Sequence, residues 1–206
     1  MTNLELITLD PQAAFADRPF TNPTNTWADL MVLDSIRTHL RATISALPSC
    51  VNNGQLYGQL FERYHYRVVL LNRRDLLSDQ PMNIVGFCGQ RRPEANLALL
   101  TQLDAELVTE LSNHPYMLAY SSHEQPDGNW INLVVMSSTP QVQRWRESAR
   151  HAYAARQLSP DYYATIRLHS GQLAAGLDSP VLQITRTMYY DFQGGWWQAV
   201  RPLADG

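Results

Sequence analysis

Hydrophobic residues recur at helical spacing between Thr26 and Pro48. Apolar side chains fall three or four positions apart there, as on one face of a helix, while Arg37 and Arg41 occupy the polar face. The Thr26 hydroxyl can cap the first turn, and Pro48 cannot continue the helix. The pattern predicts one long amphipathic helix in this segment.

The segments on either side of this helix differ in character. Residues 1–25 contain three prolines among polar residues, which predicts an irregular arm. Residues 64–71 are rich in aromatic and β-branched side chains and predict a strand, and the polar residues 73–81 after them predict a connection. We therefore expect an N-terminal extension over residues 1–80 and a core over residues 81–206.

The second half of the chain alternates strand patterns with helix patterns. The predicted elements are a strand at 83–90, a helix from Pro93 to Leu111, a hairpin of strands at 116–123 and 130–137, a helix from Thr139 to before Pro160, and strands at 163–170 and 181–192. An irregular tail begins at Gly194. Asp127-Gly128 supplies the hairpin turn, because glycine accepts positive φ without steric cost. A β-α-β-β-α-β order is that of the ferredoxin-like fold, so residues 82–170 predict an α+β unit whose antiparallel sheet carries both helices on one face.

The opposite face of such a sheet would carry no helix of this unit. The chain contains 10 Tyr, 5 Trp and 5 Phe, and an open apolar sheet face would form a sticky patch. A second copy of the chain could cover this face, and so could the N-terminal helix and arm. We expect a homodimer.

Composition excludes several classes of function. The chain has 206 residues, 45% of them hydrophobic, with a net charge of −3 and a pI near 6.0, so it presents no overall field for nucleic acid. All 16 basic residues are arginines. Mechanisms that need a lysine amine, such as a Schiff base, a pyridoxal phosphate site or a P-loop, are therefore excluded.

Cysteine and histidine usage gives no metal-binding motif. Cys50 and Cys88 are not part of a C-x-x-C pair, and no H-x-H or H-E-x-x-H spacing occurs, so no metal site is expected. Residues 1–10 lack the basic and apolar regions of a signal peptide, and no stretch approaches the length of a membrane span. We expect a cytoplasmic protein without a membrane partner.

Two segments carry a resemblance to a known family. Residues 130–151, Trp-Ile-Asn-Leu-Val-Val-Met-Ser-Ser-Thr-Pro-Gln-Val-Gln-Arg-Trp-Arg-Glu-Ser-Ala-Arg-His, and residues 162–167, Tyr-Tyr-Ala-Thr-Ile-Arg, resemble the dimeric α/β-barrel superfamily, in particular its antibiotic-biosynthesis-monooxygenase-like group. The resemblance covers about residues 82–170. It implies a pocket between sheet and helices, pairing of two copies through their sheets, and, in several members, oxidation of polycyclic aromatic substrates without metal or flavin.

One branch of that superfamily degrades haem. Its working residues are an Asn on the first strand, a Trp at the end of the third and a His on the second helix. Asn83 matches the first position, Met136 stands where the Trp is expected, and His151 lies later on the helix than the branch pattern.

The candidate site residues follow from this resemblance and from strand alternation. The candidate catalytic residues are His151, as proton shuttle, hydrogen-bond partner or axial ligand, and Asn132, which shares a strand face with Trp130. The candidate ligand-binding residues are Asn83, Phe87, Trp130, Trp145, Tyr163 and Arg167. Each also has a structural alternative: a solvated or capped histidine, a core tryptophan, a cross-strand amide partner or an arginine at a dimer rim.

The expected function is binding of a small aromatic or polycyclic molecule, with cofactor-independent monooxygenase chemistry as what the resemblance implies. No cofactor is expected under this hypothesis. The alternatives are a haem-binding protein that uses His151, and a non-catalytic binding or assembly protein.

Overall fold

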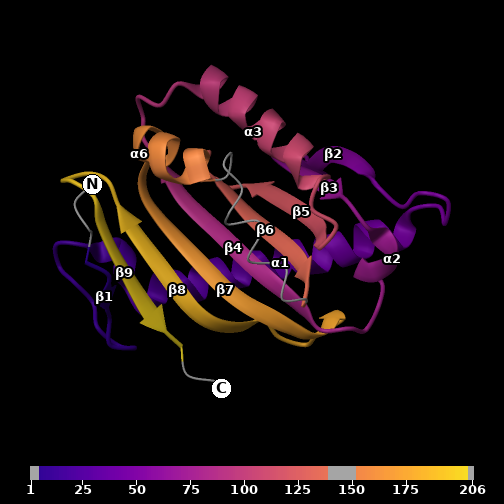
Figure 1. Ribbon diagram of the computed structural model, residues 1–206, viewed down its shortest axis with the longest axis horizontal. Coiled ribbons are helices and arrows are strands. Elements are labelled where there is room, and N and C mark those ends of the chain that lie inside the picture. Colours follow the sequence, from indigo (N-terminus) through magenta and orange to yellow (C-terminus); the bar gives the residue numbers. More distant parts are fainter. Residues whose placement is uncertain (1–4, 139–151, 204–206) are drawn as a thin grey trace.

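The described strands of the protein join into one large sheet. The computed structural model describes residues 5–138 and 152–203, and within them nine strands follow the order β1-β9-β8-β7-β4-β6-β5-β3-β2 (Figure 1). Neighbouring strands are antiparallel except β1 and β9, which are parallel. The strands are β1 Ile7–Thr8, β2 Gly54–Leu60, β3 Tyr64–Leu70, β4 Met82–Arg91, β5 Met117–Glu124, β6 Trp130–Ser137, β7 Tyr163–Leu177, β8 Gln183–Asp191 and β9 Trp197–Pro202.

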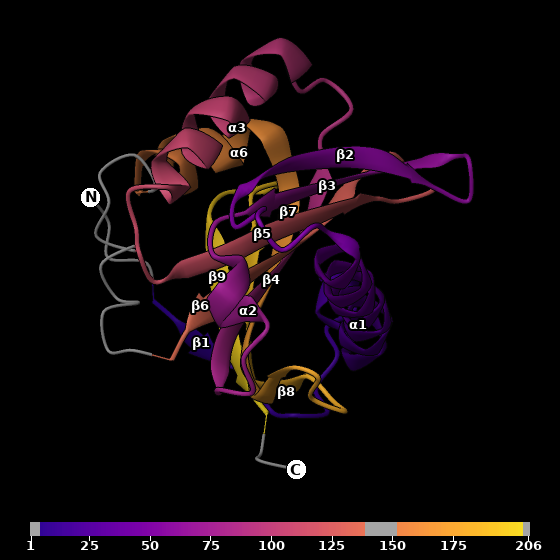
Figure 2. The ribbon, with the colours of Figure 1, turned by 90° about the vertical axis from the view of Figure 1, so that its right-hand side faces the viewer.

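Helices lie on both faces of this sheet. Helix α1 covers one face and helix α3 stands above the other, as the edge-on view shows (Figure 2). The helical segments are η1 Pro19–Thr21, α1 Pro23–Ala46, α2 Arg73–Leu76, α3 Leu97–Leu111, the π-helical η3 Ala154–Leu158 and α6 Ser159–Tyr162.

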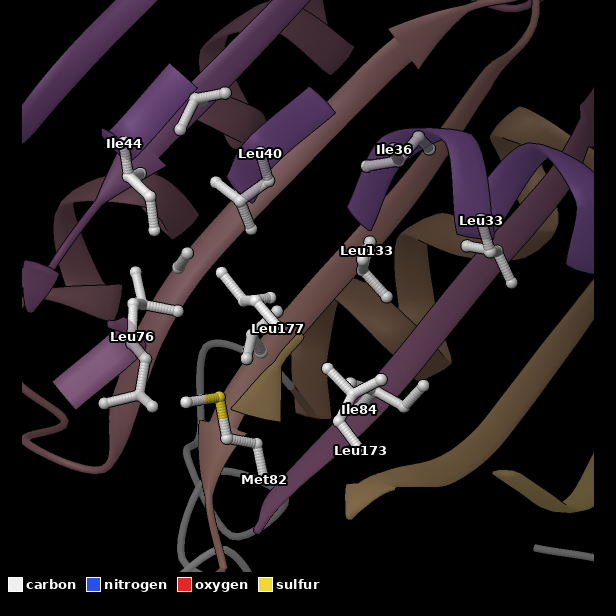
Figure 3. Close-up of a cluster of buried hydrophobic side chains, with 14 of the residues drawn as sticks. Leu33, Ile36, Leu40, Ile44, Leu76, Met82, Ile84, Leu133, Leu173 and Leu177 are labelled. Atoms are coloured by element: carbon white, nitrogen blue, oxygen red, sulfur yellow. The ribbon is translucent and has the colours of Figure 1, made fainter. Parts of the chain in front are cut away.

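The main hydrophobic core lies between α1 and the sheet. Four fully buried side chains, Leu33, Ile36, Leu40 and Ile44, recur at helical spacing and pack on residues of β3 to β7 (Figure 3). Burying each of them stabilises the fold by about 1.5–3 kcal/mol. The helix can lie this close because β4 has Gly86 beneath it: an added Cβ there would meet Leu33 Cδ1 at 2.4 Å.

Both ends of α1 are fixed by polar side chains. The Asn22 side chain accepts a hydrogen bond from the backbone N–H of Thr24, and Pro23 occupies the first helical position. At the other end the Arg73 guanidinium donates to the carbonyl oxygens of Ile44, Leu47 and Pro48 at 2.9–3.0 Å. The helix therefore begins three residues before the predicted Thr26.

The predicted ferredoxin-like fold class is wrong, because the described sheet has nine strands and is mixed, not a small antiparallel sheet. The second helix predicted for that unit, from Thr139, lies largely outside the described residues. Helix α1, which was not part of the predicted unit, covers the face opposite α3. The dimeric α/β-barrel architecture is wrong for the same reason, because α1 occupies the face through which two such sheets would pair. The strand pattern identified most of the central strands but not how many strands the sheet would contain.

Individual elements agree with the sequence more closely than the fold class does. The strands predicted at 64–71 and 83–90 and the hairpin are confirmed, and Gly128 in the hairpin turn has a φ of +78°. The strand predicted at 163–170 instead continues to Leu177, and part of the predicted irregular tail forms β9. Strand β2 was not predicted.

The two predicted segments of the chain contribute to the same sheet. The expected boundary at residue 81 falls between α2 and β4, yet β3 from the first segment pairs with β5 from the second, and β1 pairs with β9. In the described part of the chain, no helix has both the length and the hydrophobicity needed to cross a membrane.

Candidate functional site

A cavity of about 710 Å³ lies on the α3 face at one end of the sheet. It extends across strands from β7 to the edge strand β2, and α3 contributes Asp104 to its wall. Its volume is within the usual range for sites that bind small molecules. The described residues that line it are Tyr57, Gly58, Gln59, His65, Tyr66, Arg67, Gly89, Arg91, Asp104, Tyr120, Ser122, Gly128, Asn129, Trp130, Asn132 and Tyr163.

Aromatic side chains from separate strands form much of the cavity wall. Tyr57, Tyr120, Trp130 and Tyr163 come from β2, β5, β6 and β7. The Tyr163 ring lies directly over β4, because Gly89 leaves room for it: an added Cβ at Gly89 would be 2.6 Å from Tyr163 Cε1. The arrangement provides flat apolar surfaces for a planar ligand.

An ion pair connects the sheet to α3 at the cavity. Arg67 on β3 donates two hydrogen bonds to the Asp104 carboxylate, with 2.8 Å between Nη2 and Oδ1, and its guanidinium lies 5.2 Å from the centre of the Tyr120 ring. Burial alone would lower the pKa of Arg67, but the hydrogen bonds and charge of Asp104 and the interactions with Tyr120 together outweigh burial and raise the pKa. The opposite charges of Arg67 and Asp104 balance each other.

Two tyrosines of the wall remain protonated over a wide pH range. Burial raises the pKa of Tyr120, and the negative charge of Asp104 raises it further. Burial likewise raises the pKa of Tyr163. Their hydroxyl groups can therefore donate hydrogen bonds to a ligand but do not act as bases near neutral pH.

Two further polar groups of the cavity wall come from neighbouring strands. The Ser122 hydroxyl is buried beside Tyr120, and the Asn132 amide lines the cavity. They lie opposite one another on the paired strands β5 and β6. Both groups can form hydrogen bonds with a bound molecule.

The cavity contains three of the predicted site residues. Trp130, Asn132 and Tyr163 line it. Phe87 lies behind the wall, with its ring centre 5.2 Å from that of Tyr163. Asn83 lies toward the other end of β4, where its amide donates to the Ser137 carbonyl at 3.4 Å.

The remaining predicted residues are Arg167, His151 and Trp145. Arg167 faces α1, on the opposite side of the sheet from the cavity, and pairs with Asp29. His151 and Trp145 lie outside the described residues. The site as described therefore does not include the predicted catalytic histidine.

Arg167 belongs to a buried polar network under α1. The Asp29 carboxylate accepts hydrogen bonds from Arg167, at 2.8 Å from Nη2, and from His169 Nε2 at 3.0 Å, while His169 Nδ1 is 2.9 Å from the Thr187 hydroxyl. Burial by itself would raise the pKa of Asp29, but the hydrogen bonds from Arg167 and His169 outweigh it and lower the pKa.

Asp29, Cys88 and His169 place one possible metal ligand each within 4.8 Å of the others. The chemistry of this cluster opposes a cation. Both Asp29 oxygens already accept hydrogen bonds from neighbours, one of which is the permanently charged Arg167. Burial raises the pKa of the Cys88 thiol, which keeps it protonated. We interpret the cluster as a structural network.

Sequence reasoning missed several cavity residues. Tyr57 belongs to the strand that was not predicted, and Asp104 was assigned only to a helix. Alternation in residues 64–71 places Arg67 on one strand face, but the ion pair depends on a contact between residues 37 positions apart. Only the three-dimensional pairing of β3 with β5 and the position of α3 bring these groups together.

Comparisons with protein-family models, with curated proteins and with solved structures find no significant match to this chain.

Proposed function

We propose that the cavity binds a small planar aromatic molecule. The observation that carries this proposal is the set of four aromatic side chains, from four different strands, around a space of about 710 Å³. Rings that stack on such surfaces gain about 0.5–1.5 kcal/mol per pair beyond the burial of area. A ligand of two or three fused rings suits both the size and the shape of the site.

Polar groups in the wall would orient this ligand. The Ser122 hydroxyl and the Asn132 amide can each donate or accept a hydrogen bond, and the protonated Tyr163 hydroxyl can donate one. The proposal concerns binding: of the two predicted catalytic residues, Asn132 lines the cavity, and His151 lies outside the described residues.

Calorimetric titration with a neutral two-ring probe, 2-naphthol, tests the proposal. Binding with a 1:1 stoichiometry is expected, and Tyr163→Ala should weaken it about fivefold or more through the loss of one stacking surface. Trp27→Ala is the matched control, because Trp27 is a 70% exposed aromatic residue on α1. The proposal fails if the wild-type protein binds no 2-naphthol, or if the two variants lose affinity equally.

A further inference from the structure

We propose that the ligand of this cavity carries an oxyanion and that Arg91 binds it. The inference rests on the proposed function and narrows its ligand to planar aromatic acids. It follows from the balance of charge in the cavity wall and from the position of Arg91 at its edge.

Backbone contacts fix the position of Arg91 at the edge of the cavity. It is the last residue of β4 and pairs with Tyr163 across a register shift after Gln90, which puts the two side chains beside each other. Its backbone N–H donates to Asn129 Oδ1 at 2.9 Å. An added Cβ at Gly128 would lie 3.6 Å from an Arg91 terminal nitrogen, so the guanidinium extends over the hairpin turn.

The charge of Arg91 is not balanced inside the site. Among the described lining residues the arginines are Arg67 and Arg91, and the carboxylate is that of Asp104. Asp104 is already engaged by Arg67 through two hydrogen bonds. Within the described part of the chain, the Arg91 guanidinium makes no ion pair or hydrogen bond, although the residue is only partly exposed. The lining therefore carries one uncompensated positive charge.

A half-buried arginine without a carboxylate partner favours an anionic ligand. Its planar guanidinium can donate two parallel hydrogen bonds to one carboxylate or phosphate. The positive charge lies near enough to Tyr163 to counteract part of the rise in that group's pKa caused by burial. An oxyanion bound at Arg91 would thus place an attached ring system next to the Tyr163 ring.

Two ligands with the same ring system but different charge separate the contribution of the anion to affinity from that of the ring. We would titrate the full chain by calorimetry with 2-naphthoate and with the nearly isosteric neutral 2-naphthamide. Wild-type protein should bind 2-naphthoate about tenfold more tightly than 2-naphthamide, because charge-assisted hydrogen bonds are stronger than neutral ones. Titration with 2-naphthyl phosphate then distinguishes a carboxylate site from a phosphate site.

Substitution of Arg91 tests whether this residue causes the preference for 2-naphthoate over 2-naphthamide. Arg91→Gln should remove the preference for 2-naphthoate and leave the affinity for 2-naphthamide within about twofold. Arg74→Gln is the control, because Arg74 is an exposed arginine of α2 that does not line the cavity. It should keep the wild-type preference.

The outcomes distinguish this inference from the proposed function. Equal binding of the two ligands by wild-type protein, or an unchanged preference in folded Arg91→Gln, overturns the role of Arg91 and leaves aromatic binding intact. Binding of neither ligand overturns both. If Arg91→Gln does not fold, Arg91→Met retains the apolar stem and serves as the second variant; a preference that persists in it also overturns the inference.

Discussion

Asp29 of helix α1 accepts hydrogen bonds from a partly buried arginine and a fully buried histidine on β7. Arg167 and His169 both donate to its carboxylate, and the three side chains lie between α1 and the sheet. The Asp29 carboxylate and the Arg167 guanidinium stabilise the fold only as a pair, because an isolated buried charge is strongly unfavourable.

Asp29→Asn should therefore destabilise the protein. The substitution leaves the largely buried Arg167 guanidinium without its anion; a fully buried pair would lose about 3–5 kcal/mol in the free energy of unfolding, and a loss toward the lower end is expected because the Arg167 side chain is 20% exposed. Urea denaturation monitored by circular dichroism measures it. Asp34→Asn on the same helix is the control: Asp34 pairs with Arg37 at the surface, and its side chain is 47% exposed. A loss of more than about 1 kcal/mol in the control would contradict this explanation.

Gly86 is required by the close approach of α1 to β4. An alanine Cβ at this position would be 2.4 Å from Leu33 Cδ1 in a fully packed region. Gly86→Ala should cost about 1–3 kcal/mol by overpacking. In a Leu33→Ala background, Gly86→Ala should cost less than in the wild-type protein, because the side chain that it would meet is shorter. A double-mutant cycle measures this difference. Gly194→Ala, where no atom lies within 4 Å, should be nearly neutral.

At the scale of elements, helix α3 closes part of the cavity through Asp104. Near its C-terminal end Leu111 packs with Tyr116, Met117 and Met136, and farther toward its N-terminal end Asp104 is held by Arg67. The helix stands above the strands (Figure 2). The cavity lies beside Asp104 and extends to the edge strand β2.

Asp104→Asn should loosen α3 without unfolding the sheet. Losing hydrogen bonds between charged groups costs about 1.5–3 kcal/mol when they are fully buried; this pair is partly exposed, so a smaller effect is expected. Amide hydrogen exchange should become faster in α3 and stay unchanged in β4. Glu94→Gln, at a mostly exposed carboxylate, is the control. Equal acceleration in both elements would show that the pair stabilises the whole fold instead.

At the scale of the whole molecule, two histidines connect α1 to the sheet far from Asp29. His39 Nδ1 lies 3.1 Å from His123 Nε2, and the ring of Tyr66 packs edge-on against His39. Burial, with a contribution from the nearby His39, lowers the pKa of His123 to about 4, and burial also lowers the pKa of His39. Both are neutral in the native protein near pH 7.

The native state should therefore lose stability as the pH falls. In the unfolded chain both histidines bind a proton near pH 6.5, whereas native His123 does so only near pH 4. The unfolded state thus binds more protons between these values, and the free energy of unfolding decreases from pH 6.5 toward pH 4. Asp29, whose native pKa is also lowered, adds to the loss as the pH falls below the ordinary range of aspartate.

Urea denaturation between pH 7.5 and pH 4.5 measures this dependence. His123→Gln should give a shallower decrease than the wild-type protein, since it removes one of the two groups. Carbon-13 NMR of the histidine rings provides the independent measurement. A native His123 pKa near 6.5 would contradict the proposed cause.

The amphipathic pattern of residues 23–46, the alternation in residues 64–70 and 82–91 and the Asp127-Gly128 turn are local signals. They determined where a helix, strands and a hairpin form, because helix and strand periodicity and turn geometry depend on residues close in sequence. Such a pattern indicates which side of a helix or strand is buried, but not which other element covers that side. The sequence thus predicted α1 and offered it, beside a second copy of the chain, as a cover for the sheet face opposite α3, but it could not decide between the two.

The number of strands in the sheet, the side chosen by each helix and the cavity were decided by tertiary structure. They depend on pairings such as β3 with β5 and β1 with β9, which join residues far apart in the chain. Trp130, Asn132 and Tyr163 could be proposed from the sequence, while Arg67 with Asp104, and Arg91 beside Tyr163, became a site only through packing. Spacing along the chain records local conformation, whereas a binding site depends on distances across the fold.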